Sequence, residues 1–160
     1  MTKKKKMSVL ETLQKSREHI ETMWIRDTWF ASIDPENPDS QDGRDESGSV
    51  IEGWKVTGVC LAGSVLYALD YTDEQWTSQK DVQLVIEALY DALPNTVAKK
   101  KAEADAKNSF SGQVAYSEKI ETIIRFNDTP YRRKKDVLAV FDRAIDKAIA
   151  DQSITIPEFP

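Results

Sequence analysis

The sequence predicts an all-α fold, a single compact and bundle-like domain of about five helices with one long acidic loop. Three observations predict it. Apolar residues recur at helical spacing in several segments of the chain. One segment near the middle is apolar on nearly every side, which is typical of a helix in the centre of a core. The length of 160 residues suits one domain with enough core to fold alone.

The first helix is expected over residues 8–25. Ser8 and Glu11 have the Ser-x-x-Glu spacing of a capping box, in which each side chain accepts the backbone N–H of the other residue. Trp29 and Phe30 follow this helix, and we expect them to pack back on the core. The apolar stripe of the helix consists of Leu10, Leu13, Ile20 and Trp24.

Residues 33–50 are expected to form a long acidic loop, because prolines and glycines interrupt regular structure there. Six acidic residues stand in it against the single Arg44. Carboxylates of this kind suit a divalent cation, but their spacing does not fit an EF-hand loop, and the terminal glutamate of such a loop is missing. We therefore expect a solvated loop of mutually repelling charges.

Residues 59–71 predict the central helix. Ser64 is the one polar residue of this segment before Asp70, and Gly63 beside it would let another helix approach closely. A strand over residues 54–66 is the alternative. We favour the helix because Ala62, Gly63 and Ser64 are poor strand formers.

The remaining helices follow from apolar periodicity and from helix-breaking residues. A helix from residue 77 or 78 to about residue 93 ends before Pro94. Residues 97–108 are rich in alanine and charge, and predict a solvated helix or a flexible arm. Two further helices are expected, one around residues 120–124 and one over residues 136–150.

The helical domain is expected to span residues 8–152. A disordered basic tail over residues 1–7 precedes it, and Met7 is an alternative start of the chain. An extended tail over residues 153–160 follows it, since two prolines fall there.

Charge and composition argue against several classes of protein. A net charge of −5 argues against nucleic-acid binding through a broadly basic surface. No apolar run approaches the ~18 residues of a membrane span, and the lysines at residues 3–6 lack the apolar stretch of an export signal. The single Cys60 cannot form an internal disulfide. We expect a cytoplasmic protein that does not enter a membrane, and its oligomeric state stays open.

A polar corner at Phe126, Asn127 and Asp128 separates the last two helices. Asparagine tolerates the left-handed conformation that ends a helix, and Asp128 or Thr129 can accept free N–H groups of the next helix. Pro130 then suits a first helical turn, so these residues predict a helix stop and a helix start. The alternative is a polar binding site formed by Asn127, Asp128, Arg132 and Arg133.

Residues 60–64 read Cys-Leu-Ala-Gly-Ser and residues 126–128 read Phe-Asn-Asp. These two short motifs resemble those of a family of small uncharacterised proteins from actinobacteria and their phages, known as a domain of unknown function. Residues 60–64 (Cys-Leu-Ala-Gly-Ser) are similar to the Cys-x-x-Gly-Ala helix of that family. Residues 126–128 (Phe-Asn-Asp) are similar to its Trp-Asn-Asp corner, and Arg133 stands where the family usually has a threonine cap. The resemblance covers residues 54–150. It implies a phage or prophage protein that is located in the host cytoplasm, and it implies no particular activity.

A cysteine-dependent hydrolase or transferase is the catalytic alternative, with Cys60 as nucleophile, His19 as base and Asp128 as the group that orients it. A helix start lowers the pKa of a thiol. However, the apolar neighbours of Cys60 indicate a buried packing role, and the charges around His19 indicate a surface position.

Cofactor chemistry finds little support in the sequence. One cysteine and one histidine cannot supply the usual four ligands of zinc. No phosphate-binding loop, dinucleotide motif, nucleophile elbow or zinc-protease motif is present. We expect no cofactor and no metal.

Four consecutive cations at residues 132–135 open the last helix, where positive charge opposes the helix dipole. The plain explanation is solvation or internal pairing, but an unfavourable placement also hints at a use. The leading hypothesis is a non-enzymatic phage or prophage accessory protein that binds a host or phage protein. Weak nucleic-acid binding through Arg132–Lys135 is a further alternative. The residues expected at the binding surface are Asn127, Asp128, Arg132, Arg133, Lys134, Trp29 and Trp76.

Overall fold

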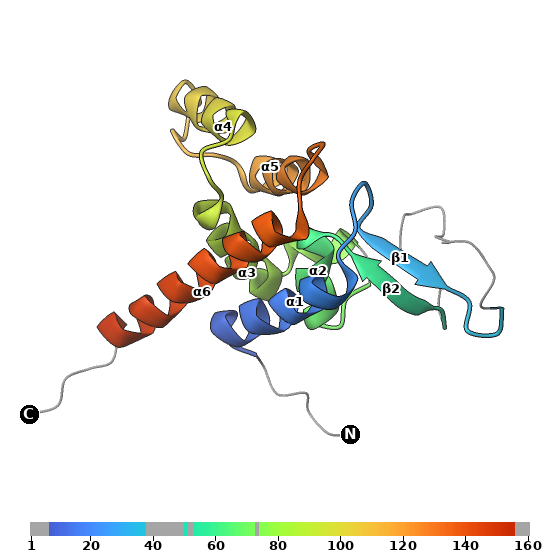
Figure 1. Ribbon diagram of the computed structural model, residues 1–160. Coiled ribbons are helices and arrows are strands. Elements are labelled where there is room, and N and C mark those ends of the chain that lie inside the picture. The colour runs from blue at the N-terminus through green and yellow to red at the C-terminus, as the bar shows by residue number, and fades with distance from the viewer. Residues whose placement is uncertain (1–6, 38–49, 51–52, 73, 156–160) are drawn as a thin grey trace, which may run out of the picture.

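The computed structural model describes residues 7–37, 50, 53–72 and 74–155. Within these residues the chain forms six α-helices, one 3₁₀ helix and a two-stranded sheet (Figure 1). The helices are α1 (Val9–Met23), α2 (Leu61–Ala68), α3 (Lys80–Ala92), α4 (Val97–Lys107), α5 (Tyr116–Asp128) and α6 (Lys134–Thr155). The strands are β1 (Phe30–Ile33) and β2 (Lys55–Val59), and the 3₁₀ helix is η1 (Glu74–Ser78). The fold is therefore mostly helical, and the sheet corrects the prediction of an all-α domain.

The sheet joins two segments that are distant in the sequence. β1 and β2 pair antiparallel, with Phe30 opposite Val59 and Ile33 opposite Lys55. The sequence of β2 contains the β-branched residues that favour strands. The central helix was predicted from residue 59, but the chain is extended up to Val59 and α2 begins at Leu61. Long-range pairing with β1 decides this boundary, and no local pattern reports such a pairing.

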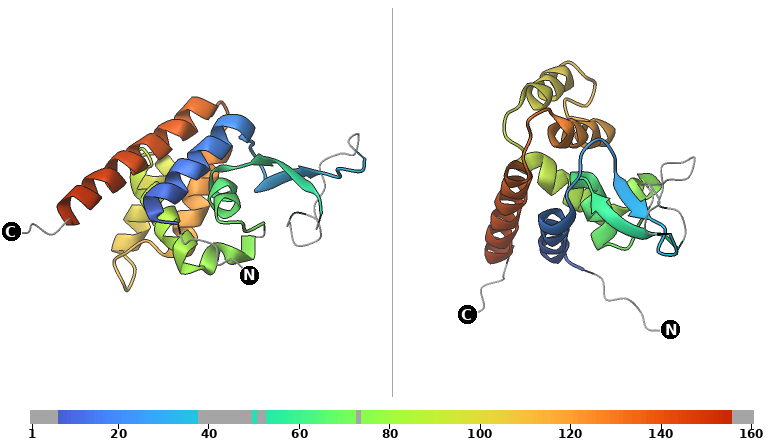
Figure 2. Two further views of the ribbon diagram at one scale, coloured as in Figure 1. Left: turned by 90° about the horizontal axis from the view of Figure 1, so that it is seen from below. Right: turned by 45° about the vertical axis from the view of Figure 1, so that its right-hand side comes forward.

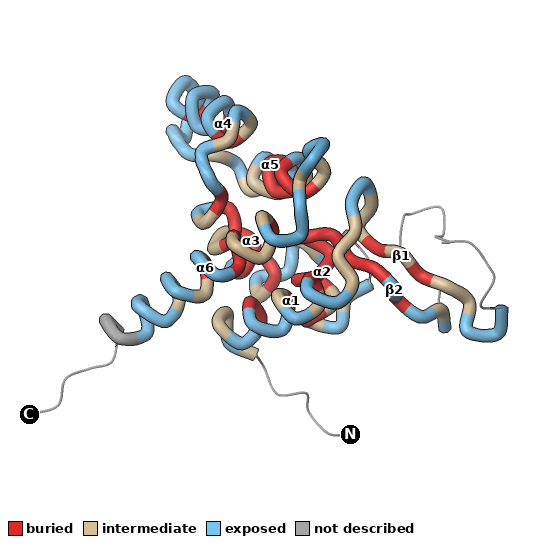
Figure 3. Tube along the Cα trace, in the orientation of Figure 1, coloured by how far each residue is buried: buried red, intermediate tan, exposed pale blue. Residues whose placement is uncertain are grey.

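Helix α2 lies in the core, as its apolar sequence predicts. Every residue of α2 from Leu61 to Leu66 is buried. Figure 3 shows further buried stretches on α3, α5 and both strands around it. Fully buried side chains from the surrounding elements include Leu13, Ile20, Phe30, Val82, Ile86, Leu89, Ile123 and Phe141.

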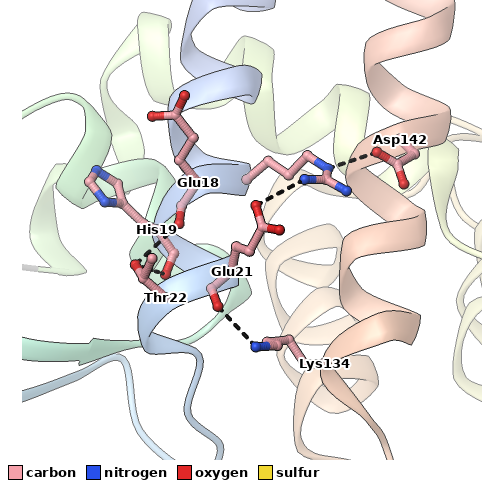
Figure 4. A network of polar contacts seen from close by, with 7 residues as sticks. Glu18, His19, Glu21, Thr22, Lys134 and Asp142 are labelled. Carbon is pink, nitrogen blue, oxygen red and sulfur yellow. Dashed lines mark hydrogen bonds and ion pairs between the residues drawn. The ribbon is translucent and has the colours of Figure 1, made fainter.

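The first and last helices lie side by side and run in opposite directions (Figure 2). Val137, Phe141 and Ala144 are buried on α6. On the exposed side of this seam, Arg17 Nε donates to Asp142 Oδ1 at 2.7 Å. The side chain of Lys134 donates to the backbone carbonyl of Glu21 at 2.9 Å (Figure 4).

Helix α4 is an outlying element that packs on α5 (Figure 1). Ala102, Ala106 and Lys99 are its buried residues, and most of its other side chains are exposed. Thr96 caps its start, since the Thr96 hydroxyl accepts the Lys99 N–H at 3.2 Å. Residues 97–108 were expected to form either a solvated helix or a flexible arm, and the structure shows the solvated helix.

Three helix boundaries can be compared with the boundaries that the sequence predicted. The capping box of α1 is confirmed, with Ser8 Oγ accepting the Glu11 N–H at 3.0 Å and Glu11 Oε1 accepting the Ser8 N–H at 3.3 Å. The cap of α3 is Gln79 and not Thr77 or Ser78, because those two residues belong to η1. Helix α6 continues to Thr155, so residues 153–155 are helical where an extended tail was expected.

The expected acidic loop falls mostly outside the described residues. Its first part is a turn, in which the Asn37 N–H donates to the Asp34 carbonyl at 3.0 Å. Residues 38–49, and residues 1–6 of the basic tail expected over residues 1–7, lie outside the described residues. Among the helices that the structure describes, none has the length and apolar character needed to cross a membrane.

Candidate functional site

The start of α2 is built around Cys60. The thiol sulfur of Cys60 accepts the Gly63 N–H at 3.2 Å and thereby caps the helix. The Cys60 N–H donates to the Trp29 carbonyl at 3.1 Å. The same carbonyl lies so close to Gly63 that a Cβ at this position would collide with it. Cys60 is thus explained by its cap on α2, and Gly63 by the close approach of the Trp29 carbonyl.

The Cys60 thiol is unsuited to catalysis. The residue is buried, and burial raises the pKa of the thiol from about 9 to about 12, more than the Gly63 N–H lowers it. Because the thiolate is the nucleophile, a thiol with this pKa stays protonated and unreactive at neutral pH.

His19 and Asp128 do not complete a catalytic set with Cys60. His19 packs edge-on against the ring of Tyr67, with the ring centroids 4.6 Å apart. Burial lowers the pKa of the His19 imidazole, and the charge of Lys15 lowers it further. Asp128 is close enough for its charge to raise the Cys60 pKa. Among the described residues, however, no hydrogen bond joins His19 to Cys60 or Asp128, and Nε2 of His19 is buried without a partner.

Asn127 is a wholly buried junction of three segments. Its side-chain oxygen accepts the Trp24 indole N–H at 2.8 Å and the Leu61 N–H at 3.0 Å. Its side-chain nitrogen donates to the Ile25 carbonyl at 3.1 Å and to Asp128 Oδ1 at 2.9 Å. Every hydrogen-bonding group of the amide is therefore occupied, and the side chain is not presented to a partner.

Asp128 serves the same junction. Its carboxylate accepts the N–H of Asp27 at 2.8 Å, and Asp27 has a positive φ of 68°.

The prediction that Asn127 ends a helix in the left-handed conformation is wrong, because α5 continues through Asp128 with Thr129 as its cap. The prediction that Asp128 or Thr129 starts the next helix is also wrong. The start of α6 is instead held by Asp136, whose carboxylate accepts the Arg133 N–H at 3.0 Å.

The basic run at residues 132–135 divides into two kinds of residue. Arg132 and Lys134 bind backbone carbonyls: Arg132 Nε donates to Phe126 O at 2.8 Å, with its guanidinium 3.8 Å above the Phe126 ring, and Lys134 binds Glu21 O. Arg133 and Lys135 are exposed. Their side chains make no hydrogen bond or ion pair with any residue in the described part of the chain. Two of the four cations therefore serve the fold, and the other two have no partner among the described residues.

Tyr131 is the residue of this corner that sequence reasoning missed. The Arg132 N–H donates to the Thr129 carbonyl at 3.0 Å, which closes a turn with Pro130 and Tyr131 at its centre. Tyr131 has φ of 68° and is 94% exposed. Glycine or asparagine is usual at this position of a turn after proline. The sequence did contain a signal for this strained turn, because a tyrosine, and not a glycine or an asparagine, directly follows Pro130.

The two tryptophans expected at a binding surface differ in exposure. Trp29 is half-buried beside α2, with its carbonyl used by Cys60. Trp76 is 44% exposed and stacks on Tyr71, with the ring centroids 5.1 Å apart. The Tyr71 hydroxyl in turn donates to Asp81 at 3.4 Å. Trp76 thus lies on the surface, and Trp29 is largely committed to the fold.

The described residues contain no cluster of three or more His, Cys, Asp or Glu side chains placed to hold a metal ion. Comparison with known protein families shows that residues 4–147 match a family described as a family of unknown function (DUF6197). No curated protein and no solved structure matches the chain.

Proposed function

The chain belongs to the family of unknown function DUF6197, and we propose, from the features of its own surface, that it acts non-enzymatically. In this proposal it binds a protein partner at the turn between α5 and α6. This recognition turn consists of residues 129–135. The partner we propose is a host or phage protein, in keeping with the resemblance of the sequence to proteins of actinobacteria and their phages.

The observation that carries the proposal is the exposed Tyr131. A left-handed backbone costs an ordinary residue about 1–2 kcal/mol, and an exposed aromatic ring has no stabilising contact of its own. Strained residues of this kind concentrate at functional sites. Tyrosine is also among the residues that dominate binding energy at protein interfaces. A fully exposed tyrosine in a strained turn is therefore a good candidate for a contact residue.

The recognition turn is tied to two helices by hydrogen bonds. Arg132 fixes its middle to the end of α5 through Phe126, and Lys134 fixes its end to α1 through Glu21. A preorganised turn loses little conformational entropy on binding. The interactions of these two cations also explain why positive charge is tolerated at the start of α6.

Arg133 and Lys135 indicate the chemistry of the partner. Both are exposed, two and four residues after Tyr131, and carry no counter-ion among the described residues. Complementary charges steer association, so the proposed partner has an acidic surface with an apolar spot for the Tyr131 ring.

The test compares wild-type protein with two matched variants, immobilised and exposed to lysate of the natural host. Tyr131→Asn removes the ring and keeps a residue that tolerates positive φ. Phe110→Asn makes the same type of change at another fully exposed aromatic, before α5. We expect mass spectrometry to identify a protein that wild type and Phe110→Asn retain and Tyr131→Asn loses. Equal retention by all three proteins would contradict the proposed surface.

Nucleic-acid binding by the same turn is the alternative that this experiment must separate. Exposed aromatic rings and cations also bind single strands by stacking and charge. The net charge of −5 opposes it. Fluorescence anisotropy with a labelled single-stranded oligonucleotide at low salt decides the matter. The nucleic-acid alternative predicts that the oligonucleotide binds, that its affinity falls with rising salt, and that binding is lost in the double variant Arg133→Gln/Lys135→Gln. This result would assign the turn a nucleic-acid partner in place of a protein partner.

A further inference from the structure

A second surface feature lies away from the recognition turn, where the end of α3, the start of α4 and the middle of α6 meet. It is a cleft of about 580 Å³. Residues 92–95 supply its backbone and apolar wall, and four charged side chains line it: Asp91, Lys99, Arg143 and Lys147.

Lys99 forms the innermost charge of the cleft. The residue is only 7% exposed. Its ammonium donates to the Leu93 carbonyl at 3.0 Å and to the Asp91 carbonyl at 3.4 Å, and lies 5.1 Å from the centroid of the Tyr90 ring. The long side chain is thus held in one position, with its charge at the wall of the cleft.

Arg143 is exposed and is anchored at one atom. Its Nε donates to the Ala92 carbonyl at 2.9 Å. No described residue bonds its two terminal amino groups, and a guanidinium presents such groups as a fork that fits the oxygens of a phosphate or a carboxylate. Lys147 follows one helical turn later on α6, so both side chains project from the same face.

Asp91 is a weak competitor for these cations. Its carboxylate lies 4.0 Å from Lys147 Nζ, and both side chains are more than half exposed. An exposed ion pair at this distance contributes little. Three cations and one carboxylate leave a formal charge of +2 in the cleft, on a chain whose net charge is −5.

We propose that this cleft binds a small phosphate monoester. A dianionic phosphate matches the local charge of +2, whereas a carboxylate would leave one positive charge uncompensated. The Arg143 fork and the Lys147 ammonium would hold the phosphate oxygens, with Lys99 behind them. The volume exceeds that of a phosphate group alone, so the remainder of the ligand would lie against Leu93 and Pro94.

The binding test uses isothermal titration calorimetry on the full chain at neutral pH and constant ionic strength. The probes are ribose 5-phosphate, inorganic phosphate, acetate and ribose. We expect the two phosphates to bind, ribose 5-phosphate more tightly, and acetate and ribose to give no heat. No heat from either phosphate, or binding of acetate equal to that of phosphate, would overturn the proposal.

Three substitutions locate the site. Lys147→Gln, at an exposed position, should weaken binding of ribose 5-phosphate about tenfold, since one charge-assisted hydrogen bond is lost. Asp91→Asn should tighten binding severalfold, because it removes the competing carboxylate. Arg133→Gln in the recognition turn should leave the affinity unchanged. Unchanged affinity in both cleft variants would refute the assignment.

A lipid headgroup presents the same phosphate chemistry. Sedimentation with vesicles that contain phosphatidic acid tests this source. Binding to the vesicles without binding to ribose 5-phosphate would contradict a small-molecule site, and binding to ribose 5-phosphate without the vesicles would support it.

Discussion

The side-chain oxygen of Asn127, at the end of α5, accepts the backbone N–H of Leu61 at the start of α2, at 3.0 Å. The first turn of a helix has N–H groups without a partner in the helix itself. Here Cys60 satisfies the Gly63 N–H and Asn127 satisfies the Leu61 N–H. The segment that starts at Cys60 and the corner at Asn127 are therefore two halves of one structural junction.

Asn127→Ala is expected to destabilise the protein by about 3 kcal/mol, because the Trp24 indole, the Leu61 N–H and the Ile25 carbonyl would all lose a buried partner. Urea unfolding followed by circular dichroism measures the change. Asp128→Ala is the companion variant, with an expected loss of about 1 kcal/mol since it removes fewer buried bonds. Equal and small effects of both variants would show that the junction contributes little.

Gly63→Ala is expected to destabilise by about 2 kcal/mol, because the new methyl group would collide with the Trp29 carbonyl and force α2 away from the sheet. Gly112→Ala is the control. Gly112 has φ of 70° and nothing within reach of a Cβ, so only backbone strain is added there. Thermal unfolding should show a larger loss for Gly63→Ala than for Gly112→Ala.

Tyr131→Gly is expected to leave stability unchanged or to raise it by up to about 1 kcal/mol, since glycine adopts positive φ without strain. Tyr131→Ala keeps the strain and serves as the control. A clear fall in the melting temperature of Tyr131→Gly would mean that the ring stabilises the fold and would weaken its assignment as a contact residue.

Cys60 is expected to resist iodoacetamide in the native protein at pH 8, because it is buried and its pKa is raised to about 12. The unfolded protein should react at the ordinary rate of a thiol. Mass spectrometry of the protein with and without denaturant measures both. Rapid alkylation of the native protein would restore the catalytic alternative.

The His19 imidazole is expected to make the protein less stable in mild acid. Its folded pKa is lowered from the ordinary value of 6.5, so the unfolded state takes up a proton first as the pH falls. The stability contributed by neutral His19 is complete above the unfolded pKa and is lost below it. Unfolding free energies between pH 7 and pH 5 should fall less steeply in His19→Phe, which keeps an aromatic contact with Tyr67. Parallel slopes for both proteins would contradict the lowered pKa.

Local sequence signals were sufficient for most helices. The Ser8 and Glu11 box set the start of α1, Pro94 followed the end of α3, and the apolar run of α2 placed it in the core. β1 was missed, and β2 was weighed only within the strand alternative over residues 54–66, because the two strands depend on each other across a long separation in the sequence. The corner at Asn127 was misread because its residues suit a helix cap equally well, and only long-range partners distinguish the two roles.

The sequence by itself determined the approximate positions of most helices and which of their faces are apolar. It also determined that one cysteine and one histidine cannot supply the usual four ligands of a zinc ion. Those properties depend on spacing and composition, which act over a few neighbouring residues. The tertiary structure decided that Asn127 is buried and that Arg132 and Lys134 bind carbonyls. It also decided that the side chains of Tyr131, Arg133 and Lys135 are exposed and have no hydrogen-bond or ion-pair partner in the described part of the chain. The physical reason is that burial and hydrogen bonding of a polar side chain depend on partners from other elements, and only the packing of α1, α2, α5 and α6 brings those partners together.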